Sequence, residues 1–125
     1  MLFATSCDRM DDNGTFEGYW HLTECEGAAL TPGTDIAWGV RNELIQFNDL
    51  RGPLSYYYAT FRRTDRELQF LELCVNDGTN DTPITFDEVP EKFHIPADGR
   101  FDILTLNNHE MVLKADNVTL RFKKN

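Results

Sequence analysis

The sequence predicts an all-β fold: a small antiparallel, predominantly up-and-down β-barrel of about eight strands. Short runs of alternating apolar and polar residues recur along the chain, with turn-forming residues between them at intervals of about 8–12 residues. Aromatic residues make up 12% of the chain, and aromatic side chains favour strands. Successive hairpins without long crossovers favour a closed meander, which leaves no free edges. A two-sheet sandwich is the second architecture that this pattern allows.

The first strand-like run, Phe16–Glu24, contains a Gly18-x-Trp20 motif. Phe16, Trp20 and Leu22 share one parity, so they place their side chains on one face of a strand that can be buried. Gly18 has no side chain on that face, which suits a bend or a close approach of another chain segment.

Seven further segments alternate in the same way. The segment 36–48 changes phase, which predicts a β-bulge near 42–44. Pro83 and Pro90 interrupt the region before the last meander, where we expect a short strand and then a helical turn near 88–93. The predicted strands cover residues 16–25, 36–48, 54–64, 67–75, 84–87, 100–106, 109–115 and 118–124.

The 125 residues correspond to one domain. We expect the barrel to occupy residues 16–125, and residues 1–15 to be a lipoprotein signal remnant and tether. Small residues 4–6 precede Cys7 and a polar run follows it, which is typical of lipid attachment to that cysteine. The charged start of a complete signal is not visible. The alternative is an unstructured N-terminus with an isolated cysteine.

These features together resemble the lipocalin-like lipoproteins of Bacteroidetes envelopes. The resemblance rests on Cys7, the acidic tether after it, Gly18-Tyr19-Trp20, and a C-terminal meander that ends at Thr119–Lys124. It implies a lipocalin-like barrel whose closed end is plugged by Trp20, with Arg121 lying over the indole ring. It also implies an outer membrane lipoprotein of the bacterial cell envelope, with surface display compatible with the acidic tether. The middle-loop Thr-Asp-Tyr motif is absent, since residues 64–66 match it only in part.

Composition and motifs argue against several function classes. The net charge is −9, and no basic stripe suited to nucleic acid is present. The three histidines are not at metal-ligand spacing, and there is no Cys-x-x-Cys. Neither serine lies in a nucleophile-elbow motif. We therefore expect no catalytic set, no metal and no cofactor, and a protein that is not an enzyme.

The sequence supports two functional hypotheses. The first is a non-catalytic envelope lipoprotein that binds a small apolar or amphipathic ligand in or at the barrel, anchored to the membrane through Cys7. The residues expected to line that ligand site are Trp38, Tyr57, Phe61 and Phe70. The alternative is a protein- or glycan-interaction module with a filled barrel, because an eight-stranded barrel can be narrow enough for side chains to fill it.

Two cysteines follow Cys7 in the sequence. Cys25 and Cys74 both fall near predicted strand ends. An oxidising envelope would permit a disulfide between them, but we expect two free, partly buried thiols.

Overall fold

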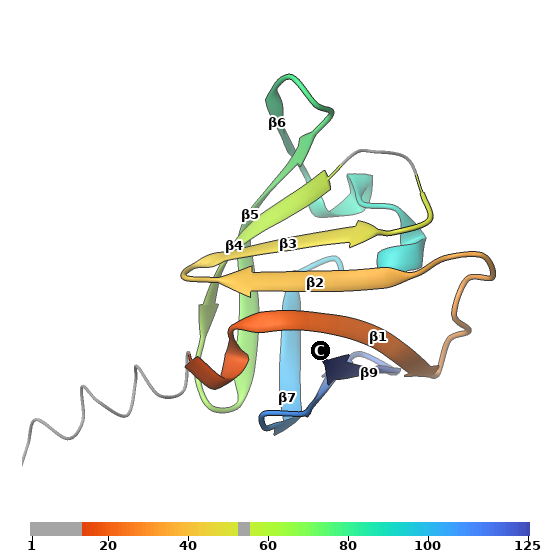
Figure 1. The fold of residues 1–125 in the computed structure, drawn as a ribbon, viewed down its shortest axis with the longest axis vertical. Coiled ribbons are helices and arrows are strands. Elements are labelled where there is room, and N and C mark those ends of the chain that lie inside the picture. Colours follow the sequence, from red (N-terminus) through yellow and green to blue (C-terminus); the bar gives the residue numbers. More distant parts are fainter. Residues whose placement is uncertain (1–13, 53–55) are drawn as a thin grey trace, which may run out of the picture.

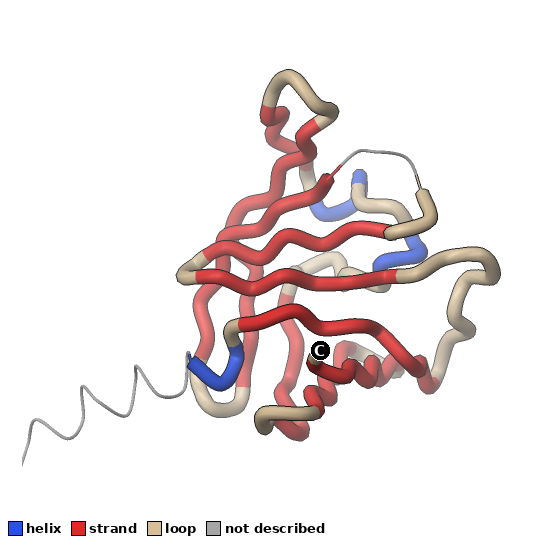
Figure 2. Tube along the Cα trace, in the orientation of Figure 1, coloured by secondary structure: helices blue, strands red, loops and turns tan. Residues whose placement is uncertain are grey.

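The computed structural model describes residues 14–52 and 56–125, which form nine strands, two 3₁₀ turns and, at residues 14–16, a helical turn (Figures 1 and 2). The strands are β1 (Gly18–Glu26), β2 (Ile36–Arg41), β3 (Leu44–Asp49), β4 (Tyr56–Arg63), β5 (Glu67–Asn76), β6 (Asp81–Ile84), β7 (Arg100–Leu106), β8 (Glu110–Ala115) and β9 (Val118–Lys124). The 3₁₀ turns are η1 (Phe86–Glu88) and η2 (Glu91–Phe93). Within the described part of the chain, no helix is long and apolar enough to cross a membrane.

Eight strands close into an antiparallel barrel in the order β4-β3-β2-β1-β9-β8-β7-β5, and pairing between β4 and β5 completes the ring. Strands that are neighbours in the barrel are also consecutive in sequence, apart from the β1–β9 and β5–β7 pairs. This confirms the predicted up-and-down barrel. The ninth strand, β6, pairs with the second half of β5, and Figure 1 shows the β5–β6 hairpin projecting beyond the barrel.

The predicted bulge in residues 36–48 is a hairpin turn instead. β2 ends at Arg41, β3 begins at Leu44, and these two residues pair directly across the turn. Asn42 adopts a positive φ of 55°, a conformation that asparagine tolerates better than most residues. A two-residue hairpin turn and a one-residue β-bulge both shift the alternation of apolar and polar residues by one position. The apolar pattern alone therefore could not distinguish the turn from the bulge.

Aromatic side chains fill the middle of the barrel around Trp38, which is completely buried. The Trp38 ring lies 4.7 Å from Phe122, 5.5 Å from Phe70, 5.8 Å from Phe101 and 6.4 Å from Phe47 between centroids. Inward residues of β2, β3, β5, β7 and β9 therefore meet at one point. Such tilted and edge-on ring pairs pack favourably.

Chain segments cover both ends of this core. At one end, Phe16 precedes β1, is fully buried, and packs edge-on against Phe61 at 5.3 Å. At the other end, Phe93 of η2 is buried and lies 5.3 Å from the rings of both Phe47 and Tyr57. Residues from before β1 and from the β6–β7 connection thus close the two ends.

Candidate functional site

The four residues predicted to line a ligand site lie in the packed interior. Trp38 and Phe70 contact each other and are fully buried. Tyr57 is half-buried and stacks on Phe47 at 5.7 Å, toward the end covered by Phe93. Phe61 lies at the opposite end, against Phe16. The structure therefore brings Trp38 and Phe70 together but separates Tyr57 from Phe61.

Trp20 is completely buried and its indole Nε1 donates a 2.9 Å hydrogen bond to the Phe16 carbonyl. Arg121 does not lie over its ring. Leu120 and Phe122 point into the core, so Arg121 between them points outward, where its Nε lies 2.9 Å from Glu26 and 3.7 Å from Glu24. The predicted Trp20–Arg121 contact is thus wrong, because the parity of β9 opposes it.

Lys124 takes the place predicted for Arg121. It pairs with Trp20 in the β1–β9 ladder, and its Nζ lies 5.0 Å from the centroid of the indole ring. Gly18 makes this possible, because a Cβ at that position would lie 2.6 Å from Cε of Lys124. The absence of a side chain at Gly18 therefore leaves room for the Lys124 side chain to reach the Trp20 ring.

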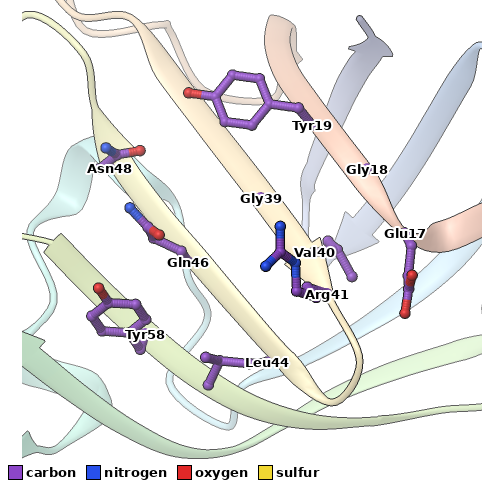
Figure 3. Close-up of a pocket in the computed structure, with 10 residues that line it drawn as sticks. All are labelled: Glu17, Gly18, Tyr19, Gly39, Val40, Arg41, Leu44, Gln46, Asn48 and Tyr58. Carbon is purple, nitrogen blue, oxygen red and sulfur yellow. The ribbon is translucent and has the colours of Figure 1, made fainter.

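A groove of about 720 Å³ runs across the outer wall of the barrel over β1, β2, β3 and β4 (Figure 3). We call it the wall groove. Figure 3 shows the Tyr19 ring extending from β1 over β2, with its hydroxyl toward the side where Asn48 and Gln46 rise from β3. The wall groove is lined by Glu17, Gly18, Tyr19, Gly39, Val40, Arg41, Leu44, Gln46, Asn48 and Tyr58.

A glycine on the outward face of β2, Gly39, creates the wall groove. The cross-strand register places Tyr19 opposite Gly39, Gly39 opposite Gln46, and Gln46 opposite Tyr58. Gly39 contributes no side chain to this outer row, so a trough remains between the longer side chains of β1 and β3. A Cβ at Gly39 would contact only the Tyr19 ring, at 3.5 Å.

Asn48 is the polar group of the wall groove that most needs a partner. The residue is only 8% exposed, and its side-chain amide makes no hydrogen bond with any residue in the described ranges. The amide has donors and an acceptor to satisfy, and its atoms are not among the fully buried polar atoms without a partner, so they remain accessible from the groove. The Asn48 amide is therefore available to water or to a ligand in the groove.

The charges along the wall groove have opposite signs. Glu17 accepts a 2.8 Å hydrogen bond from the backbone N–H of Asn42, and Arg41 contributes a guanidinium. The remaining polar groups are neutral hydroxyls and amides. The groove thus offers one acidic group, one basic group and neutral hydrogen-bonding groups beside the rings of Tyr19 and Tyr58.

A second groove of about 510 Å³ adjoins the first and shares Leu44 and Tyr58 with it. We call it the apolar groove. Apolar side chains of β5, β6 and η1 form most of it, with Leu71 exposed at its edge. It is lined by Leu44, Tyr58, Thr60, Leu71, Glu72, Leu73, Cys74, Pro83, Ile84, Thr85 and Phe86.

A third groove of about 440 Å³ lies at the end of the barrel covered by η2. There Lys92 donates a 3.0 Å hydrogen bond to the carboxylate of Asp49, which also accepts from the backbone N–H of Asp35 and Arg51. Burial acts to raise the pKa of Asp49, but these hydrogen bonds and the Lys92 charge outweigh it and hold the pKa below its ordinary value. The Lys92–Asp49 ion pair therefore connects η2 to β3, and the two charges neutralise each other.

Metal-binding chemistry has no support from the geometry. Among residues 14–52 and 56–125, no group of three or more His, Cys, Asp or Glu side chains is placed to hold a metal ion. His94 is half-buried next to η2, and burial lowers its pKa despite the opposing effect of Glu91. Cys7 lies outside the described residues.

The closed eight-stranded antiparallel barrel with one additional strand defines a lipocalin-like fold. The chain belongs to the family described as "Lipocalin-like domain", which matches residues 1–125. The crystal structure of a lipocalin-like protein from Bacteroides uniformis ATCC 8492 is similar, with a TM-score of 0.59 and 15% sequence identity over 90% of this chain and 100% of that one. At this identity the likeness concerns the fold. No curated protein matches the chain.

Proposed function

We propose that this protein is a non-catalytic binding module that holds a small ligand on the outer wall of its barrel, in the wall groove. One observation carries the proposal: the position where a barrel interior would hold a ligand is occupied by Trp38 and the four phenylalanine rings around it. A lipocalin-like barrel is compatible with binding in general. The Trp38 indole N–H is buried inside the barrel without a hydrogen-bond partner in the described ranges, whereas the Asn48 amide without a protein partner faces the outer wall.

The wall groove has the properties of a recognition surface for a small polar molecule. It combines aromatic faces with a small number of converging polar groups, which is the composition usual for ligand sites. Tyr58, from the tyrosine run of β4, faces this groove, whereas Tyr57 packs inside on Phe47. Tyr58 is therefore placed to stack on a ligand in the wall groove, whereas Tyr57 contributes to packing of the interior.

Filling the floor of the wall groove tests the proposal. A panel of mono- and disaccharides, fatty acids and short peptides is titrated into the ¹⁵N-labelled protein. We expect a bound compound to shift the amide resonances of Tyr19, Gly39 and Gln46, and to leave the Trp38 indole resonance in place. Gly39→Leu, which extends into the groove, should abolish binding, whereas Gly39→Ala should retain it.

Two results would contradict the proposal. One is a panel in which no compound shifts the groove amides. The other is binding that shifts the Trp38 indole and persists unchanged in Gly39→Leu, which would place the ligand inside the barrel. Melting temperatures of the unliganded variants, measured beside the wild type, separate loss of binding from loss of folding.

We also propose that Cys7 is lipidated and anchors the barrel to the bacterial cell envelope, at the outer membrane. The proposal is supported by the residues around Cys7 in the sequence. The full-length precursor is expected to incorporate a palmitate analogue during growth, and Cys7→Ala is expected to incorporate none. Equal labelling of the two proteins would refute it.

A further inference from the structure

We infer that the ligand of the wall groove is an amphiphile, with a neutral hydroxylated head in the wall groove and a hydrocarbon chain in the apolar groove. This inference rests on the proposed function, since it names the ligand class of the same site. It is drawn from the contrast between the two adjoining grooves.

The two grooves form one continuous path over the outer wall. They meet at Leu44 and Tyr58, which line both. Leu44 is 42% exposed at this junction. Because Tyr58 lies opposite Gln46 on one side and Cys74 on the other, a single ligand that crosses Tyr58 passes from the polar to the apolar groove.

The polar end fits a neutral head with several hydroxyl groups. Asn48, a residue only 8% exposed, offers a side-chain amide without a protein partner in the described ranges, and Gln46 and Tyr19 place further polar atoms beside it. A hydroxyl both donates and accepts, so it can satisfy both atoms of an amide. Glu17 and Arg41 balance each other, and the chain carries a net charge of −9, which disfavours an anionic head.

The apolar end fits an alkyl chain. Leu71 is 45% exposed because the register shift between Thr60 and Phe61 leaves it without a cross-strand partner. Beyond it lie Ile84 and Phe86, which are half-buried against the core, and Leu73, which belongs to the buried core. Each CH₂ group buried there is expected to raise affinity by about fourfold.

A chain-length series tests this inference. Glucose, hexyl β-glucoside and octyl β-glucoside are titrated below their critical micelle concentrations, with amide shifts and calorimetry as readouts. We expect glucose to shift only the wall-groove amides, and both glucosides to shift the amides of Leu71 and Cys74 as well. Octyl β-glucoside should bind roughly fifteenfold more tightly than hexyl β-glucoside, since two more CH₂ groups are buried.

Leu71→Glu places a charge in the apolar groove, and Leu104→Glu is its matched control, since Leu104 is 56% exposed on β7 and lines neither groove. Leu71→Glu should weaken octyl β-glucoside at least tenfold and leave glucose unaffected, whereas Leu104→Glu should bind as the wild type does. Leu71→Ala, which adds no charge, should give a smaller loss and serves if the glutamate variant does not fold.

The failures of the two proposals can be told apart. Equal affinity for the two glucosides, or equal binding by the two glutamate variants, overturns the amphiphile inference. If glucose still binds and Gly39→Leu abolishes that binding, the wall groove keeps its proposed function. Absence of binding by all three compounds overturns the inference, and the wider panel then decides the function.

Discussion

The ammonium group of Lys124 lies over the Trp20 ring, 5.0 Å from its centroid, and donates a 2.8 Å hydrogen bond to the carbonyl oxygen of Thr15. One residue of the last strand therefore contacts both the buried Trp20 ring and the segment that enters β1. The cation–π contact with Trp20 is made by Lys124, whose side chain points toward that ring. Arg121, three residues earlier, points outward and pairs with Glu24 and Glu26.

Lys124→Met should lower the free energy of unfolding by about 1–2 kcal/mol, because the cation–π contact and the hydrogen bond to Thr15 are both lost. Arg121→Met is the matched control, and because its ion pairs are exposed and screened by solvent, the loss should be smaller. Urea denaturation of both variants measures the difference. A larger loss in Arg121→Met would contradict the assignment of Lys124.

Gly18→Ala should destabilise the barrel by about 1–3 kcal/mol. Its φ of 135° is unfavourable for any other residue, and the new Cβ would lie 2.6 Å from Cε of Lys124. Gly39→Ala is the control, because its φ is not positive and its new Cβ meets only an ordinary contact. The melting temperatures of the two variants check this. Equal shifts would show that Gly18 is not required by geometry.

The stability of the protein should depend on pH through Asp49. Because the pKa of Asp49 is below its ordinary value of 3.8 in the folded chain, its contribution is complete above about pH 5 and is lost as the pH falls through the folded pKa. In Asp49→Asn, the free energy of unfolding should fall less steeply between about pH 5 and pH 3. Lys92→Met should flatten the curve in part, since the backbone donors remain.

Parallel urea titrations across this pH range test the prediction. An Asp49→Asn protein whose stability falls as steeply as that of the wild type would mean that other carboxyl groups carry the dependence.

Cys25 and Cys74 should react slowly with thiol reagents in the native protein. Both are free and half-buried, which confirms the expected thiols. Burial raises the pKa of each, and the charge of Asp81 adds to the effect at Cys74, so little thiolate forms at neutral pH. Thiol counting without reductant should find both groups reactive after unfolding. A count that falls short by two would reveal a disulfide.

The last meander could be predicted from sequence because each residue is apolar or polar according to the side that it faces. The predicted strands 100–106 and 118–124 coincide with β7 and β9. The hairpin at Asn42 could not be distinguished from a bulge, since both change the phase of alternation. A prediction of strand partners, rather than of strands, would have been needed.

The wall groove was missed for a different reason. Sequence reasoning searched for apolar residues that might surround a ligand, and it found Trp38 and Phe70, which pack on each other. The groove depends instead on a missing side chain, at Gly39, and on the register that places Tyr19 and Gln46 beside it. A glycine on the polar parity of a strand, next to tyrosine and amide residues on neighbouring strands, is the signal that could have located it.

The division of β5 between two partners has a consequence for motion. Its first half pairs with β7 at Glu67–Gln69, and its second half pairs with β6 at Leu73–Asn76. The connection between β6 and β7, which lies within the described residues, contains no paired strand and packs on the barrel through side chains such as Phe86 over Gly99 and Phe93. Detaching this connection breaks no strand ladder, so it is the least costly local opening of the structure. Amide exchange should accordingly be fastest along residues 86–98 and slowest in β1, β2 and β9.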